Sequence, residues 1–372
     1  RSVSADPAPP VDLEAWLTAK IRRDGPVPVS DYMAACLTHP QFGYYTTQRS
    51  IGAAGDFITA PEISQVFGEL IGLWTAVVAR SMQRTSLLTI AEIGPGRGTL
   101  MADALRALLR VAPDVLTGAG IALVEISDRL AAEQARTLRH APVAVARHRD
   151  IAEIDGPMII IGNEILDALP VRQAVFRSGA WRERTVDVAA SGGFAWSTGA
   201  ACALPSTLAQ AARGPQVGDI AEWRCWETPG GMLATIAAKA HRAPLAALFI
   251  DYGHAASALG ETLQAVRGHA VAPPLAAPGR ADLSAAVDFA AFLEAATRSG
   301  LSTHGPITQA AFLGRLGITE RAEQLLAAAR SAAVANGIEA GIQRLLAPAG
   351  MGGRFKVVAV ASQGLPIPPG FA

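Results

Sequence analysis

The sequence predicts an α/β protein built on a mostly parallel sheet with helices on both faces. Short apolar segments alternate with helical patterns through the centre of the chain. One segment, 158–161, contains no polar residue, as expected of a strand that is buried on both faces. The length of 372 residues allows two domains, or one large domain with insertions.

Composition excludes several classes of protein. Half of the residues are hydrophobic and 17% are charged, so we expect a large core and not a disordered chain. Lys+Arg and Asp+Glu both number 32, which gives no electrostatic case for nucleic acid or an anionic membrane. Three cysteines are too few for a disulfide framework, and the apolar runs are shorter than a membrane span. We expect a soluble protein without a secretory signal, in a reducing, intracellular compartment.

The N-terminal part has helical patterns. Apolar spacing predicts a helix over 11–23, ended by Gly25, and a second short helix that starts near Ser30. A longer pattern over 63–78 predicts one long helix. The run Thr59-Ala60-Pro61-Glu62 before it resembles a capping box.

The centre of the chain alternates strand and helix patterns. We expect strands at 87–93, 121–126, 141–146 and 158–161, and helices at 99–110 and 129–140. After Pro170, short polar–apolar alternations predict antiparallel strands, and the tryptophans of this part are expected to form its own core (Trp181, Trp196, Trp223 and Trp226). Later elements follow: a buried strand at 246–250, helices over 285–298 and 308–346 with breaks at Gly317 and Gly337, and a last strand at 355–361.

A glycine-rich turn joins the first central strand to its helix. It has the form E-x-G-x-G-x-G, with Glu92, Gly94, Gly96 and Gly98. Glycines there let the backbone approach a ligand and leave helix N–H groups free to bind it. A dinucleotide fingerprint would place its third glycine at Thr99. The turn instead resembles the first motif of class I S-adenosylmethionine (SAM) methyltransferases, where the acidic residue lies near the methionine end of the cofactor.

Polar residues also follow the next three strands. Glu125 can accept both ribose hydroxyls, a device that NAD and SAM enzymes share. Asp150 is placed to meet the adenine amino group, with Ile151 beside the ring. Asn163 and Glu164 end the fourth strand, near where the methyl group would be presented. Each alone could be a solvated strand end, but ligands of open α/β sheets bind beyond the carboxyl ends of the strands.

Several longer runs resemble one family across roughly residues 30–360. It is the MidA-like family, which contains the mitochondrial complex I assembly methyltransferase and its bacterial relatives. The matching runs are Gly55–Leu70, the glycine turn, Val124–Ser127, Gly162–Val171, Ile250–Gly253, Val287–Phe289, Thr308–Leu313 and Met351-Gly352. Two segments depart from the family pattern, Ala277-Pro278-Gly279 and Ser284–Phe289, and this leaves the substrate open.

The resemblance implies the Rossmann-like sheet of a class I SAM methyltransferase with three additions. We expect a helical N-terminal cap at 1–84, a β-rich insertion at 171–240 and a helical C-terminal insertion at 308–346. The SAM-binding core would then consist of 85–170, 241–307 and 347–365. It also implies a protein arginine methyltransferase that acts on a subunit of respiratory complex I (NADH-quinone oxidoreductase). The location would be cytoplasmic in a bacterium, or the mitochondrial matrix in a eukaryote.

Glu164 and Asp167 are the candidate catalytic residues. Their i, i+3 spacing puts them on one face of a turn, where two carboxylates can orient a guanidinium. Asp167 has an alternative role as a cap of the segment before Pro170.

Three further acids are weaker candidates. Asp56 is expected to cover the cofactor. Glu62 either completes the capping box or contacts a ligand, and Asp251 with Tyr252 is a candidate to line the substrate cleft.

Two other functions compete with methyl transfer. One is an assembly chaperone that binds SAM without turnover, and the other is a nicotinamide oxidoreductase. Thr99 and Glu92 argue against the second. The seven histidines show no metal-ligand spacing, so no metal site is predicted.

Overall fold

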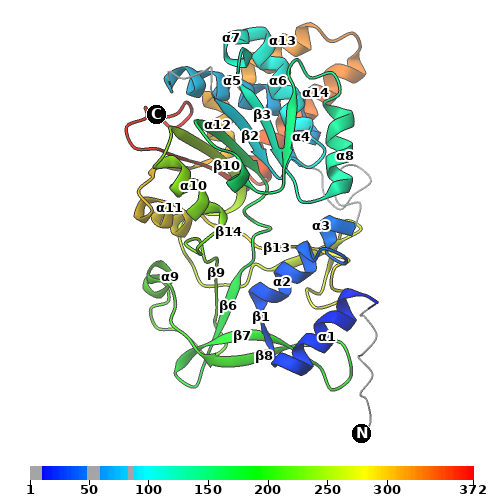
Figure 1. The fold of residues 1–372 in the computed structure, drawn as a ribbon, viewed down its shortest axis with the longest axis vertical. Helices are drawn as coiled ribbons and strands as arrows, with labels where there is room; N and C mark the ends of the chain where they lie inside the picture. Colours follow the sequence, from blue (N-terminus) through cyan, green and yellow to red (C-terminus); the bar gives the residue numbers. More distant parts are fainter. Residues whose placement is uncertain (1–10, 48–58, 83–87) are drawn as a thin grey trace. The chain divides into compact units, whose positions relative to one another are not determined.

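The computed structural model describes residues 11–47, 59–82 and 88–372, which form two compact units (Figure 1). Of the described residues, the β-rich unit takes 11–47, 169–224 and 259–285. The parallel-sheet unit takes 59–82, 88–168, 225–258 and 286–372. Each unit is assembled from segments that lie far apart in the sequence.

An eight-stranded sheet forms the centre of the parallel-sheet unit. Its order is β15-β16-β10-β5-β2-β3-β4, and β14 pairs with the end of β10. The five strands from β10 to β4 are parallel to their neighbours, whereas β16 runs antiparallel to both β10 and β15. The carboxyl ends of the five parallel strands therefore meet at one edge. The strands are β2 Thr89–Ile93, β3 Gly120–Val124, β4 Val145–His148, β5 Met158–Asn163, β10 Leu245–His254, β14 Val287–Asp288, β15 Ser302–Thr308 and β16 Phe355–Ala361.

Helices flank this sheet, which confirms the predicted α/β fold with a mostly parallel sheet. They are α4 Ala60–Ile63, α5 Gln65–Ser81, α6 Thr99–Val111, α7 Pro113–Leu116, α8 Asp128–Thr137, α10 Met232–Ala240, α11 Phe289–Arg298, α12 Gln309–Arg315, α13 Ile318–Ala327, α14 Ala332–Leu346 and α15 Met351–Arg354, with a 3₁₀ turn, η2, at Ile151–Glu153. One predicted strand, 141–146, is displaced to β4. Ala141 and Val143 pack against the core from the preceding turn without pairing in the sheet.

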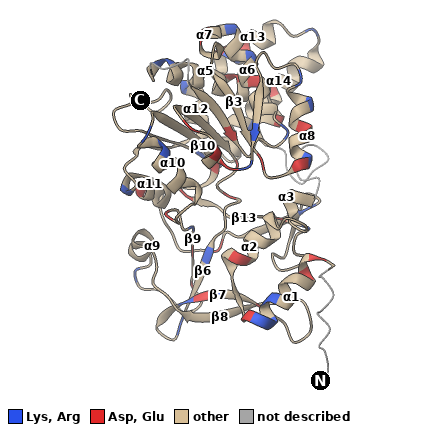
Figure 2. Ribbon diagram, viewed as in Figure 1, with Lys and Arg blue, Asp and Glu red and all other residues tan. Residues whose placement is uncertain are grey.

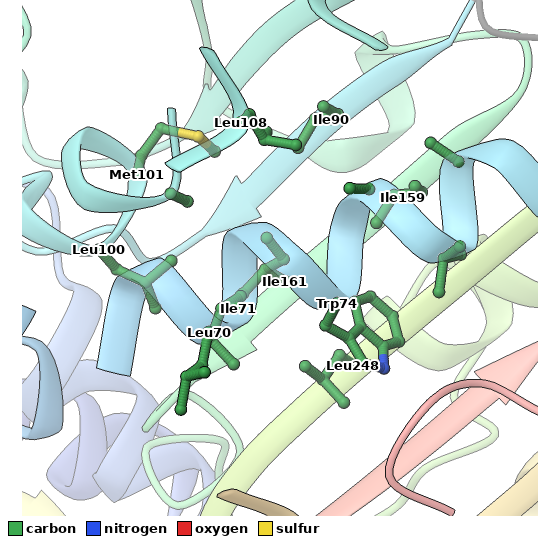
Figure 3. Packing of buried hydrophobic residues seen from close by; sticks show 14 of the residues in the cluster. Leu70, Ile71, Trp74, Ile90, Leu100, Met101, Leu108, Ile159, Ile161 and Leu248 are labelled. Atoms are coloured by element: carbon green, nitrogen blue, oxygen red, sulfur yellow. The ribbon is translucent and has the colours of Figure 1, made fainter. Parts of the chain in front are cut away.

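Helix α5 packs into the core of the parallel-sheet unit. Leu70, Ile71 and Trp74 lie among buried side chains of the sheet and of α6 (Figure 3). Two glycines allow α6 to approach closely: a Cβ atom on Gly68 would lie 2.6 Å from the Cβ of Asp103, and one on Gly72 would lie 2.7 Å from the Ala104 carbonyl oxygen. Residues 59–82 thus belong to the sheet's own core, unlike the N-terminal cap expected over 1–84.

Serine side chains set two helix starts that the apolar pattern missed. The single helix predicted over 63–78 is divided into α4 and α5, because the Ser64 hydroxyl accepts the Val66 N–H at 3.3 Å and starts α5. Thr59 makes no side-chain cap, so the predicted capping box is wrong. The break at Gly317 is confirmed. The second break comes at Ser331, which caps α14, and Gly337 lies inside that helix.

The β-rich unit contains two antiparallel sheets. The larger has the order β1-β7-β6-β9, with β8 on β7, and the smaller has the order β12-β11-β13. Its elements are α1 Leu13–Asp24, β1 Val27–Pro28, α2 Val29–Thr38, α3 Tyr44–Thr47, β6 Arg172–Arg177, β7 Ala180–Val188, β8 Phe194–Ala201, α9 Ser206–Ala211, β9 Ile220–Trp223, β11 Gln264–Arg267, β12 Ala270–Ala272 and β13 Asp282–Ser284.

The antiparallel strands predicted after Pro170 are confirmed, but the unit differs from the expected 171–240 insertion. Val27 of the N-terminal segment pairs with Val186 of β7, and residues 259–285, expected in the core, also join the unit. Such pairing is long-range, so local pattern does not reveal it. Trp181 and Trp223 pack in this unit's core, whereas Trp226 packs against Phe292 of the parallel-sheet unit, with ring centroids 4.9 Å apart.

Candidate active site

The glycine turn lies between β2 and α6 and has a conformation that suits glycine. Gly94, Gly96 and Gly98 have φ angles of 63°, 54° and 81°, all in the left-handed region that other residues adopt at a cost. Gly98 occupies the N-cap position of α6 and offers no side-chain acceptor. The first N–H groups of α6 are therefore left without a side-chain cap, as in helix N-termini that bind ligands.

Glu125 follows β3 and is held through both carboxylate oxygens. It is 5% exposed, with Oε1 accepting the Ser127 N–H at 2.7 Å and Oε2 accepting from Gln134 Nε2 at 3.1 Å. Burial raises the pKa of Glu125, and these two hydrogen bonds oppose that shift. The carboxylate is oriented by neutral donors before any ligand arrives.

Gln134 is a residue of this candidate site that the sequence reasoning missed. It is 2% exposed and lies on α8, with the buried Leu130 four residues before it and the buried C-cap residue Leu138 four residues after it. The three residues share a spacing of four, so they line one inward face of the helix. A single amide on an otherwise apolar inward face was the available signal.

Glu92 lies near the end of β2 and keeps one oxygen unpaired. It is 3% exposed, and its Oε2 has no hydrogen-bond partner in the described part of the chain. Burial raises the pKa of Glu92 to about 8, and a backbone hydrogen bond from Met101 opposes the shift. The Oδ1 of Asn163, at the end of β5, is also buried and unpaired within the described residues. Two orphan acceptors at this edge fit a ligand that brings N–H or O–H donors, and the amino acid end of SAM carries an ammonium group.

The predicted adenine contacts lie after β4. Asp150 is exposed and accepts the Ala152 N–H at 2.8 Å, which caps the η2 turn, while Ile151 is buried. Both residues follow a strand of the same carboxyl edge, and their contacts with adenine stay predictions. Asp56 lies outside the described residues.

Glu164 comes directly after β5 in a strained backbone conformation. Its φ is 53°, and its N–H donates to the Ile250 carbonyl oxygen at 2.8 Å. The Oε1 atom accepts the Ala60 N–H at 3.2 Å and Asn163 Nδ2 at 3.1 Å. Burial raises the pKa of Glu164 to about 7, and the charge of Asp167 adds to the shift. Strain of this kind concentrates at functional positions.

Asp251 supports the loop that carries Glu164 and Asp167. It is fully buried, so the expectation that it lines a cleft is wrong. Its Oδ2 accepts the N–H groups of Leu166 at 2.8 Å and Asp167 at 3.0 Å, and its Oδ1 accepts that of Tyr252 at 2.8 Å. Burial raises the pKa of Asp251 well above its usual range, and the charges of Asp167 and Glu164 act in the same direction.

Helix α4 contacts both parts of this edge. Glu62 accepts from the Thr99 hydroxyl and forms an ion pair with Arg97 Nη1 at 3.0 Å, which ties α4 to the glycine turn. Two residues before Glu62, the Ala60 N–H donates a hydrogen bond to Glu164 Oε1. Glu62 therefore anchors α4, instead of completing a capping box.

Acidic residues gather along the carboxyl edge of the parallel strands (Figure 2). Glu92, Glu125, Glu164 and Asp251 lie on or directly after four neighbouring strands, β2, β3, β5 and β10. Such an edge suits a ligand or an acceptor that carries positive charge.

An apolar hollow lies at the opposite end of the strands. Its lining includes Ala246 at the start of β10, Ala361 at the end of the antiparallel β16, and Ile367. Because ligands of such sheets bind at the carboxyl ends, we do not assign the cofactor to this hollow. Over the described ranges, no helix is both long and apolar enough to cross a membrane, and no cluster of three or more His, Cys, Asp or Glu residues is arranged to hold a metal.

Comparison with known families identifies similar sequences over most of the chain. A family model for S-adenosyl-L-methionine-dependent methyltransferases matches residues 70–307. The chain is 34% identical to the Drosophila melanogaster "Protein arginine methyltransferase NDUFAF7 homolog, mitochondrial", over 94% of this chain and 84% of that protein. It is 32% identical to the human "Protein arginine methyltransferase NDUFAF7, mitochondrial", over 92% and 82%. These names place the relatives in mitochondria and give no support to the cytoplasmic location expected above.

A solved structure has the same fold. The crystal structure of a protein from Burkholderia thailandensis that is described as a "likely methyl transferase", bound to S-adenosyl-homocysteine, superposes with a TM-score of 0.81 at 28% identity. The match covers 96% of this chain and 93% of that one.

Proposed function

Because the chain belongs to the family of S-adenosyl-L-methionine-dependent methyltransferases, we propose that it transfers a methyl group from SAM to an arginine side chain of a protein. The names of its relatives support arginine as the acceptor. One observation in the structure carries the proposal. Two acidic residues, Glu164 and Asp167, follow β5 on a loop that the buried carboxylate of Asp251 supports.

The carboxyl edge offers each part of the cofactor a partner. We assign the ribose hydroxyls to Glu125, the amino acid end to Glu92 and Asn163, and the adenine to Asp150 and Ile151. The glycine turn would let the backbone approach the cofactor closely. When bound, SAM supplies a methyl group that is already activated by its sulfonium.

The acceptor residues would then orient a guanidinium. Glu164 and Asp167 can accept hydrogen bonds from its N–H groups, which aims one nitrogen at the methyl group and draws electron density toward it. When that nitrogen forms its bond to carbon it must lose a proton. Glu164 is suited to accept it, because its pKa of about 7 is close to a neutral working pH.

The family resemblance also suggests which protein carries the arginine. A subunit of respiratory complex I is the candidate substrate, and the gene name that the relatives carry is consistent with it. If the chain is eukaryotic, the mitochondrial names of those relatives support a mitochondrial location.

Replacement of Glu164 by Gln tests the proposal, because Gln removes the charge with little change of shape. We expect the affinity for S-adenosylhomocysteine in calorimetry to stay within about twofold, since Glu164 is not assigned to the cofactor. Labelled methyl transfer to arginine in a lysate should fall by about tenfold or more. The wild-type rate should rise with pH through about 7, and the variant should lose this rise. Exposed Glu339 of α14 offers a charge-matched control, Glu339→Gln, with unchanged activity.

Two outcomes would count against arginine methylation. One is full activity in the Glu164→Gln protein. The other is label that is recovered mainly in methyl-lysine after acid hydrolysis of the protein, or mainly in nucleic acid or a small metabolite. If the wild-type chain binds S-adenosylhomocysteine but labels no acceptor, the assembly chaperone becomes the better assignment.

A further inference from the structure

The geometry points to Gln134 as a positioning residue that joins the glycine turn to the ribose-binding carboxylate and makes the site selective for an intact ribose. The inference rests on the assignment of the ribose to Glu125 under the proposed function, and it concerns cofactor binding alone. It therefore holds or fails independently of the identity of the methyl acceptor.

One side-chain nitrogen of Gln134 binds two parts of the site. Nε2 donates to the Gly96 carbonyl oxygen at 2.8 Å and to Glu125 Oε2 at 3.1 Å. Gly96 belongs to the turn after β2, and Glu125 follows β3. Since an amide nitrogen carries two hydrogens, both are used, and each is aimed at a different strand end.

Packing of α8 against the glycine turn fixes the position of this amide. A Cβ atom on Gly98 would lie 3.5 Å from the Cα and Cγ atoms of Gln134 and 3.5 Å from Leu138 Cδ1. Ser127 caps α8 by accepting the Leu130 N–H at 3.4 Å, so the helix begins immediately after the Glu125 segment. The side chain of Gln134 is thus held on a rigid helix at contact distance from the turn.

The consequence for Glu125 is a fixed carboxylate plane. Ser127 donates to one oxygen and Gln134 to the other, so each oxygen keeps a further lone pair for an incoming hydroxyl. Two ribose hydroxyls can then bind one carboxylate side by side. Without Gln134, Oε2 would lose its donor and the carboxylate could rotate. The contact with the second hydroxyl should weaken more than the rest of the cofactor contacts.

A ligand pair separates this role from general support of the fold. The experiment measures, by calorimetry, the affinities of S-adenosylhomocysteine and of its 2′-deoxyribose analogue for the full chain. We expect the wild-type protein to bind the ligand with the intact ribose about tenfold or more tightly, because the deoxy analogue lacks one hydrogen bond to a charged group. Gln134→Met keeps the length of the side chain and removes its donors. It should reduce this preference to about threefold or less.

Matched variants complete the test. Leu138→Met changes a buried neighbour on the same helix face without removing a hydrogen bond, and it should leave the ribose preference unchanged. Gln134→Leu also removes the donors and provides the same test if the Met variant does not fold. A wild-type protein that binds both ligands equally would overturn the inference. So would Gln134 variants that weaken both ligands by the same factor, which is the behaviour of a residue with only a structural role.

Discussion

The acidic groups at the two ends of the carboxyl edge differ in the charges around them. At the cofactor end, Glu125 is bound through both oxygens by neutral donors, Ser127 and Gln134. At the acceptor end, Glu164 and Asp251 both have pKa values raised by burial and by the charge of Asp167. The carboxylate of Glu125 is thus oriented by neutral donors, while the acids of the acceptor end repel one another, and a bound cation would relieve that repulsion. Under the proposed function, this difference lets one edge hold a cofactor and favour a cationic acceptor.

The largest effect should come from Gly96→Val, which changes only the cofactor end and should lower its affinity for the cofactor. A β-branched residue at a φ of 54° strains the turn, and its side chain would fill space that the proposed function assigns to the cofactor. We expect the affinity for S-adenosylhomocysteine in calorimetry to fall by about a hundredfold or more.

A glycine outside the site provides the control for that experiment. Gly337 lies inside α14, and apart from its own helix no atom of the described residues lies within 4 Å of an added Cβ, so Gly337→Ala should leave cofactor binding unchanged. Unchanged affinity in the Gly96→Val protein would show that the cofactor does not approach this turn.

Asp251→Ala tests the acceptor end. The substitution leaves the N–H groups of Leu166, Asp167 and Tyr252 without their acceptor in a buried place. Each unsatisfied donor lowers stability, although water that enters the space can satisfy some of them. We therefore expect the free energy of unfolding in urea to fall by roughly 2 kcal/mol. Methyl transfer should fall more than affinity for S-adenosylhomocysteine, because the loop that carries Glu164 is freed. Asp155→Asn, at an exposed acid, is the control. A larger loss of cofactor affinity than of transfer would mean that the two ends are not separate.

The smallest effect is expected from Glu92→Gln and appears in the pH dependence of stability. The pKa of Glu92 is about 8 in the folded protein and 4.5 in the reference state, so the folded protein binds this proton more tightly. Stability from this group is therefore present below about pH 4.5 and decreases as pH rises toward 8, by at most ~1.4 kcal/mol per pH unit. The Gln variant lacks this slope. Between pH 7 and pH 8 we expect the wild-type protein to lose roughly 1 kcal/mol relative to the variant, as measured by denaturant unfolding at each pH.

The same variant should bind S-adenosylhomocysteine more weakly, since a Gln side chain cannot ionise to pair with the ammonium group of the ligand. Parallel pH profiles for the two proteins would contradict the assignment of a raised pKa to Glu92. If the affinity for S-adenosylhomocysteine is unchanged in the Gln variant, the assignment of the cofactor's amino acid end to Glu92 is wrong.

Periodicity and strand-end residues determined much of this protein from sequence alone. The apolar strands that became β2, β3, β5 and β10 were predicted because a strand buried on both faces must be apolar throughout. The glycine turn and Glu125 were found because close backbone approach and strand-end carboxylates leave local signals. The resemblance to a methyltransferase family rested on such runs.

Tertiary structure alone decided how distant segments combine and how the acids are held. The pairing of Val27 with Val186, and the place of residues 259–285 in the β-rich unit, come from contacts between segments far apart in the chain. Asp251 looked like a cleft residue from its strand-end position, yet it is buried beneath the loop that it supports. Local pattern encodes burial and backbone conformation, whereas the partner of a buried polar group is set by three-dimensional packing. For that reason the two hydrogen-bond partners of Gln134, which lie 38 and 9 residues away in the sequence, became visible only in the folded chain.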